Sequence, residues 1–205
     1  MAEAIHPAAP MTARENPFAP GRLRRVLGFD PVLAGTTWEK LESRWHQLGC
    51  RAAVTGHRGS GKTSLLDAWA ERFDESPLRL FFNDRHRDFD AADRAVLASC
   101  AGKVLFIDGE NHLSWLRRRE LRRASQAAAG VLVARHGRGG WPELIRLRSS
   151  AQQAAILLDR ASPDCSAAFL PEVADRWQAN RGNLRELLLG CYDDLAAGKK
   201  TFEKT

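Results

Sequence analysis

The glycine-rich stretch GHRGSGKT is the feature that most constrains how this chain can fold. It occupies residues 56–63, between the apolar segment RAAVT and the segment KTSLLDAWAERF, which has apolar residues at helical spacing. Glycines permit the tight backbone turns that such a loop needs. A strand that passes through a glycine-rich turn into a helix predicts a βα unit, with backbone N–H groups and the positive end of the helix dipole at the loop.

Strand-like and helix-like segments alternate around this loop. Strands are predicted at residues 51–55, 78–82, 103–108, 130–135 and 144–148, and helices at residues 38–49, 62–73, 89–100 and 113–129. This alternation predicts parallel pairing with right-handed crossovers. The expected fold class is therefore α/β, a three-layer core around a mostly parallel, five-stranded sheet.

The pattern changes after residue 149, where only helical segments follow. Serine or asparagine caps and glycine stops mark several of them, at residues 149–160, 162–169, 171–182 and 183–198. We expect a Pro-rich N-terminal arm over residues 1–35, the α/β core over 36–148, a small helical subdomain over 149–198 and a tail over 199–205.

The glycine-rich stretch matches the pattern G-x-x-x-x-G-K-[ST] in full, with a strand before it and a helix after it. In such a loop the lysine, here Lys62, reaches the β- and γ-phosphates, and the hydroxyl of Thr63 binds Mg²⁺. The pattern predicts ATP and Mg²⁺ as cofactors, and a plain glycine-rich turn is the alternative. The predicted nucleotide-binding residues are Gly56, His57, Arg58, Gly59, Ser60, Gly61, Lys62, Thr63 and Ser64.

Two acidic residues follow the predicted strand VLFID. Asp108 lies at its carboxyl end, where α/β sheets place ligand groups, so it is a second candidate for the Mg²⁺ site. Glu110 is the candidate catalytic base for hydrolysis. Gly109 separates the two acids and can bend the chain, so Glu110 is either a catalytic base or a loop carboxylate.

The next strand, GVLVAR, ends at Arg135 and is followed by His136. A polar residue at this position faces the γ-phosphate from the adjacent strand. His136 is the first candidate for this catalytic role and Arg135 the second; a surface histidine without a role is the alternative.

The motifs, taken in order, resemble those of AAA+ ATPases over about Trp38 to Leu195. GNLRE places Arg185 in the first turn of the last helix and looks like the sensor-2 element of that family, which implies a contact of Arg185 with the nucleotide. A structural ion pair is the alternative for Arg185. The resemblance also implies the sheet order 5-1-4-3-2 and a helical lid, and the chain is similar to small bacterial helper ATPases and to uncharacterised short bacterial P-loop proteins.

The segment LSWLRRRELRRASQ carries a dense group of arginines. Trp115, Arg118, Arg119 and Arg122 fall on one helical face, and the residues expected to face the core are Leu113, Leu116, Leu121, Ala124 and Ala128. Trp115 and these arginines are candidate contacts for nucleic acid or an acidic protein partner. A solvated face is the alternative.

Composition adds three expectations. The formal net charge of +6 is compatible with polyanionic partners. The four cysteines are scattered, which predicts buried, reduced thiols in a cytoplasmic protein without a cysteine metal site. No apolar run reaches the ~18 residues that a membrane-spanning helix needs.

We therefore expect an Mg-ATP-binding, AAA+-like protein that acts as an ATP-dependent switch or weak ATPase, on itself as an oligomer or on a protein partner. A nucleotide-binding regulator that does not hydrolyse ATP is the first alternative. A P-loop kinase for small molecules is the second.

Overall fold

A computed structural model of the chain describes residues 12, 16–137 and 139–199. The chain divides into two compact units. One is the continuous segment Phe29–Arg148, here called the α/β unit. The other, here called the helical unit, combines the described residues up to Gly28 with those from Ser149 onward.

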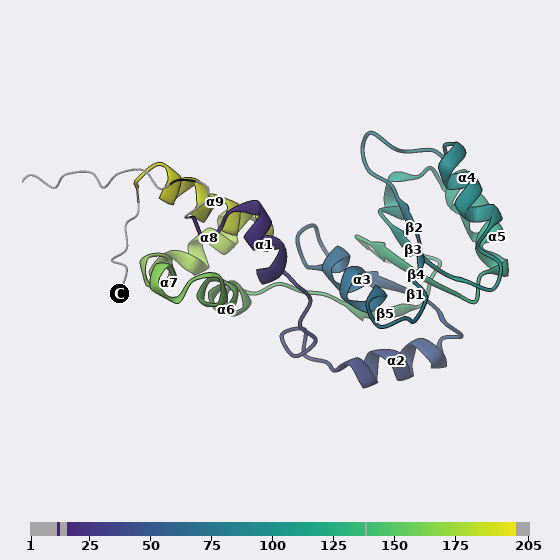
Figure 1. Cartoon of the computed structure of the whole chain (residues 1–205), viewed down its shortest axis with the longest axis horizontal. Helices are drawn as coiled ribbons and strands as arrows, with labels where there is room; N and C mark the ends of the chain where they lie inside the picture. The colour runs from purple at the N-terminus through teal and green to yellow at the C-terminus, as the bar shows by residue number, and fades with distance from the viewer. Residues whose placement is uncertain (1–11, 13–15, 138, 200–205) are drawn as a thin grey trace, which may run out of the picture. The chain divides into compact units, whose positions relative to one another are not determined.

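The α/β unit is built on a five-stranded parallel sheet (Figure 1). Its strands are β1 (Arg51–Thr55), β2 (Leu78–Phe81), β3 (Val104–Asp108), β4 (Gly130–Arg135) and β5 (Glu143–Arg146). They lie in the order β2-β3-β4-β1-β5, which is the predicted order read from the other edge. The α/β fold class and the sheet order expected from the resemblance to AAA+ ATPases are therefore confirmed.

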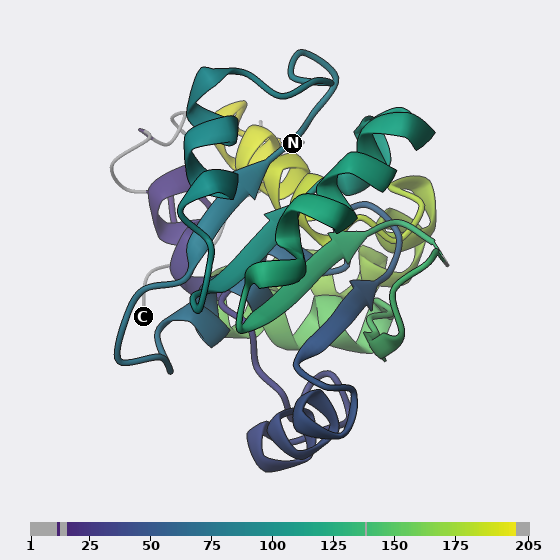
Figure 2. The ribbon, with the colours of Figure 1, turned by 90° about the vertical axis from the view of Figure 1, so that its right-hand side faces the viewer.

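Helices cover both faces of this sheet (Figures 1 and 2). They are α2 (Trp38–Gln47) and α3 (Lys62–Ala70) on one side and α4 (Ala91–Ala98) and α5 (Trp115–Ala124) on the other. Successive strand residues point to opposite faces, so β1 gives Ala52 and Val54 to one core and Ala53 to the other. The central strands β1, β3 and β4 are consequently buried on both sides.

Side-chain caps fix where several of these helices begin. The side chain of Thr37 accepts a hydrogen bond from Lys40 N at the start of α2, and Ser114 accepts one from Arg117 N at the start of α5. Asp90 and Asp93 form a reciprocal capping box at the start of α4. Each cap satisfies a backbone donor that the first helical turn leaves unpaired.

The helical unit contains α1 (Pro20–Val26), α6 (Ala151–Ala161), α7 (Pro163–Phe169), α8 (Val173–Ala179) and α9 (Leu184–Ala196). The sequence indicates the last four helices but not α1, which falls within the predicted arm. In the structure, Phe18 is fully buried and packs edge-on against Phe169. The side-chain amide of Asn16 donates to Tyr192 O at 3.0 Å. Residues 16–28 are thus part of the helical unit, while most of the arm before them and tail residues 200–205 lie outside the described residues.

Two expectations about individual residues are wrong. Leu116 is 60% exposed, whereas Leu113 and Leu121 are buried. The helix begins only at Trp115, so Leu113 lies before it, and Leu116 and Leu121 point about 140° apart around the helix axis. Cys50 is only partly buried because it lies in the turn between α2 and β1, where its φ is 57°.

Within the described part of the chain, no helix combines the length and hydropathy that crossing a bilayer requires.

Candidate nucleotide-binding site

Three neighbouring parallel strands bring the predicted site residues to one edge of the sheet. Thr55 at the end of β1 is in register with Arg135 at the end of β4. Asp108 at the end of β3 is in register with Ala134 of β4. The glycine-rich loop that follows β1 therefore begins beside the carboxyl ends of β3 and β4, which is where open α/β sheets place their ligands.

The backbone of the glycine-rich loop needs its glycines. Gly59 and Gly61 have φ angles of 77° and 91°, in the region that L-residues with side chains rarely adopt. A Cβ at Gly56 would lie 2.6 Å from Leu147 O and would also collide with the Ser60 side chain. The hydroxyl oxygen of Ser60 is buried and finds no hydrogen-bond partner among the described residues. An orphaned hydroxyl in a loop of this kind fits an anionic ligand.

Lys62 opens helix α3 and bends back over the loop. Its ammonium group donates to Gly56 O at 2.8 Å and to His57 O at 2.7 Å. The side chain is buried, and this burial lowers the pKa of Lys62, while the Asp108 carboxylate opposes the shift. A buried ammonium group that is held by carbonyl oxygens is suited to receive phosphate oxygens.

The two predicted Mg²⁺ ligands are in direct contact. The hydroxyl of Thr63 donates to Asp108 Oδ2 at 2.6 Å, which joins the first turn of α3 to the end of β3. Both groups offer the hard oxygen atoms that Mg²⁺ prefers. The residues present therefore fit a magnesium ion at this position.

Glu110 is engaged with other partners. Gly109 has a φ of 82° and its Cα lies so close to Phe82 O that no side chain fits there. The chain turns at Gly109 into the short 3-10 helix η1 (Glu110–His112). Glu110 is fully buried: its Oε2 lies 3.1 Å from Arg135 Nη1, and its Oε1 accepts from Trp141 Nε1 at 3.1 Å. Both carboxylate oxygens are thus engaged inside the α/β unit, and Glu110 has no free oxygen with which to act as a base.

Arg135 and His136 have opposite orientations. Arg135 is 6% exposed and turns inward to Glu110, so it is not available at the loop. His136 is exposed at the end of β4. Partial desolvation, and then the positive charges of Lys62 and His112, lower the pKa of His136 despite the opposing effect of Asp108. His136 is thus within electrostatic reach of Lys62 and Asp108.

Sequence reasoning missed three side chains around the site. His112 Nδ1 lies 3.3 Å from Asp84 Oδ1, and the charge of His112 contributes to lowering the pKa of His136. Trp141 holds Glu110 from a loop that carries no motif. The only available signal for His112 was its place shortly after Asp108, and no signal pointed to Asp84 or Trp141.

Arg185 belongs to the helical unit. It is the second residue of α9, after Asn183, whose side chain caps the helix by accepting from Glu186 N. The Arg185 side chain is exposed, and within the described part of the chain no carboxylate pairs with it. The structural ion pair that was the alternative for Arg185 is thus not seen in residues 16–137 and 139–199.

The predicted arginine face lies on α5. Trp115 and Arg119 are exposed, and Arg118 and Arg122 are half-buried. These residues share one side of the helix, as expected.

No protein-family model matches this chain, and no curated protein sequence matches it. Among solved structures, the chain is similar to the Holliday junction branch migration motor RuvB of Thermotoga maritima, with a TM-score of 0.49 and 15% identity over 82% of this chain and 72% of that one. It is also similar to a point mutant of the same RuvB, with a TM-score of 0.49 and 16% identity over 80% and 69% of the two chains. The sheet order, with the glycine-rich loop between β1 and α3, is that of a P-loop fold.

Proposed function

We propose that the α/β unit binds Mg-ATP and that the protein works as an ATP-dependent switch with weak hydrolysis. The observation that carries this proposal is the hydrogen bond from Thr63 to Asp108 beside the buried ammonium group of Lys62. A metal-binding hydroxyl, a metal-orienting carboxylate and a phosphate-binding lysine then converge on one loop.

The loop supplies the phosphate-binding part of this site. Ser60 has a buried hydroxyl without a partner in the described part of the chain, and the close approach of Ser60 and Leu147 O to Gly56 leaves no room for a Cβ there. Residues 56–61 lead directly into α3, whose first turn offers backbone N–H groups and the positive end of the helix dipole to an anion. Bound Mg²⁺ would neutralise charge on the phosphates, and Thr63 and Asp108 would hold it.

The burial of Glu110 supports weak hydrolysis. A general base must lie within hydrogen-bond reach of the attacking water, and both oxygens of Glu110 are occupied by Arg135 and Trp141. Release of Glu110 would require breaking a buried ion pair. A protein that holds ATP for long before hydrolysing it is suited to signal through conformation or assembly, as a self-oligomer or on a protein partner.

The burial of Glu110 also favours a second candidate function, a nucleotide-binding regulator that does not hydrolyse ATP. The two candidates differ in phosphate release, which is measurable for the first and absent for the second. The small-molecule kinase has no support from the described residues, which offer no recognisable acceptor site.

Thermal unfolding with and without nucleotide tests the proposal. A ligand at 100 times its Kd that binds only the folded state adds about 2.7 kcal/mol, or roughly 5–10 °C in Tm for a chain of this length. We expect such a shift with Mg-ATP for the wild type and its loss for Lys62→Ala. Lys103→Ala, which removes the same charge from an exposed position on the α/β unit, is the matched control and should keep the shift. A wild-type Tm that is indifferent to both Mg-ATP and Mg-ADP would overturn the proposal.

A further inference from the structure

Helix α5 concentrates positive charge on a short segment. Its ten residues, WLRRRELRRA, include five arginines and one glutamate. Like charges at neighbouring helical positions repel one another, so acids nearby or a bound anion would stabilise a helix with this composition. The arginines of α5 fall into two groups: those that have acids nearby and those that do not.

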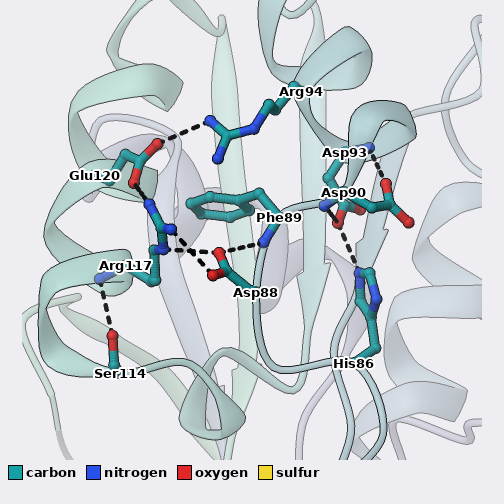
Figure 3. Close-up of polar contacts among 9 residues, drawn as sticks. All are labelled: His86, Asp88, Phe89, Asp90, Asp93, Arg94, Ser114, Arg117 and Glu120. Carbon is teal, nitrogen blue, oxygen red and sulfur yellow. Dashed lines mark hydrogen bonds and ion pairs between the residues drawn. The ribbon is translucent and has the colours of Figure 1, made fainter.

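Arg117 represents the group with acids nearby (Figure 3). Its guanidinium lies 2.6 Å from Glu120 Oε2 and 2.7 Å from Asp88 Oδ1. The other oxygen of Glu120 pairs with Arg94 of α4 at 3.2 Å. The guanidinium groups of Arg94 and Arg117 both lie against the ring of Phe89. The acids on this side of α5 are therefore already neutralised within the unit.

The second group comprises Arg118, Arg119, Arg122 and Arg123. Throughout the described part of the chain, no carboxylate lies within ion-pair distance of any of these four. The Nε atoms of Arg118 and Arg122 are buried and have no hydrogen-bond partner among the same residues. Four positive charges on one short helix thus remain uncompensated there.

Arg122 is held in place by stacking. Its guanidinium lies over the ring of Trp141, 5.3 Å from the ring centre. It also lies against the backbone of Gly140, where a Cβ would collide with it. Stacking orders the side chain without cancelling its charge, so Arg122 loses little conformational entropy when it binds an anion.

An exposed aromatic residue begins the same face. Trp115 is 64% exposed, and Arg118, Arg119 and Arg122 follow it at three, four and seven residues along the helix. The planar face of an exposed tryptophan stacks on unpaired bases, while arginines at this spacing contact the phosphates between them.

We propose that this face of α5, defined by Trp115, Arg118, Arg119 and Arg122, binds single-stranded nucleic acid. Charge complementarity selects a polyanion, because the arginines lack acid partners within the described residues. The exposed tryptophan selects a single strand, because the base faces of a duplex are already stacked on one another. The site belongs to the α/β unit alone and is separate from the nucleotide-binding loop.

Fluorescence anisotropy with a labelled DNA single strand of about 16 nucleotides tests the proposal. The wild type should bind, and log K should fall linearly with log salt concentration. Arg118→Ala and Arg122→Ala should each reduce the magnitude of that slope by about 0.7. Trp115→Ala should weaken binding about 5- to 150-fold and leave the slope unchanged. Leu116→Ala, next to Trp115 and similarly exposed, is the control for apolar area, and Lys103→Ala is the control for charge.

Each of the following four outcomes would overturn the proposal. Equal effects of Arg122→Ala and Lys103→Ala would mean diffuse attraction by net charge. Tight binding of a duplex that Trp115→Ala does not weaken would mean backbone recognition of double-stranded DNA. Displacement of the strand by polyglutamate at lower concentration would identify an acidic protein segment as the partner. Loss of an oligomer on Trp115→Ala in size-exclusion chromatography would mean that a second copy covers the face.

Circular dichroism of each variant checks its folding. Repeating the binding measurement without nucleotide and with Lys62→Ala separates this site from ATP binding.

Discussion

Glu110 and Arg135 form an ion pair in the interior of the α/β unit, with side chains 0% and 7% exposed and 3.1 Å between the charged atoms. Trp141 donates to the second oxygen of Glu110. Glu110, the acid next after the predicted Mg²⁺ ligand Asp108, is thereby engaged with other partners, although its place in the sequence makes it a candidate catalytic base.

Replacing Glu110 should primarily affect stability. Glu110→Gln leaves the charge of Arg135 buried and uncompensated, so we expect the free energy of unfolding to fall by about 3 kcal/mol. Adding Arg135→Met should recover part of this loss, because it removes the unpaired charge. Urea unfolding of the single and double variants measures both effects.

The same variant tests catalysis. Both oxygens of Glu110 are held by Arg135 and Trp141, so phosphate release per folded molecule should fall less than tenfold in Glu110→Gln, below the usual range for loss of a positioned base. A larger fall, at unchanged ATP affinity, would show that Glu110 leaves Arg135 and Trp141 during turnover.

The contact between Thr63 and Asp108 predicts how Mg²⁺ affects affinity. Wild-type protein should bind ATP more tightly with Mg²⁺ than with EDTA. Asp108→Asn and Thr63→Ala should each reduce this advantage, by about 10- to 100-fold for a group that orients the ion. Titration of ATP with and without Mg²⁺ gives the ratio. An unchanged ratio in both variants would place the metal elsewhere.

The lowered pKa of His136 predicts that ATP binding is coupled to proton uptake. Its pKa is lowered in the folded protein, so near neutral pH it is mostly uncharged. A phosphate anion nearby favours the charged form and raises this pKa, so binding should take up protons, and affinity should increase as the pH falls below neutral. Isothermal titration in two buffers with different ionisation enthalpies measures the uptake. It should decrease in His136→Asn and persist in His112→Asn, and equal uptake in the wild type and His136→Asn contradicts the assignment.

Arg185 tests whether the helical unit responds to the nucleotide. An arginine in the first turn of a helix is unfavourable for the helix dipole by a few tenths of a kcal/mol, and no acid within the described residues compensates Arg185. Arg185→Ala should weaken ATP more than ADP, by about 1–3 kcal/mol for one charge-assisted contact. The Tm without nucleotide should change little. Equal losses for ATP and ADP, or a large fall in that Tm, would mean a structural role.

Local pattern was sufficient to predict much of the fold. The strands β1, β3 and β4 are apolar runs between turn residues, and α6 and α9 begin at the serine and asparagine caps that the sequence indicates. Helix α1 escaped prediction because it is only seven residues long, lacks acids in its first turn and follows a Pro-rich segment. Its stability comes from packing against α6, a contact that no local pattern records.

The candidate site also contains residues that local sequence predicts and residues whose orientation depends on distant contacts. Lys62, Thr63 and Asp108 were predictable because their positions depend on one loop and on the ends of strands. The orientation of Glu110 was not, because it depends on the φ of Gly109 and on partners 25 and 31 residues further along the chain. Leu116 was placed on the wrong face because the start of α5 at Trp115 sets the direction of every side chain that follows.

The helical unit is assembled from two stretches of chain that the whole α/β unit separates. Asn16 and Phe18 find their partners at Tyr192 and Phe169, so the core around Phe18 cannot close until those residues have been synthesised. Residues 29–148, by contrast, form a continuous segment with its own two cores. Because domains generally fold as units during synthesis, the α/β unit should form first on the ribosome, while the segment around Phe18 waits for its partners. A chain interrupted shortly after residue 148 would therefore carry a folded α/β unit and an exposed Phe18.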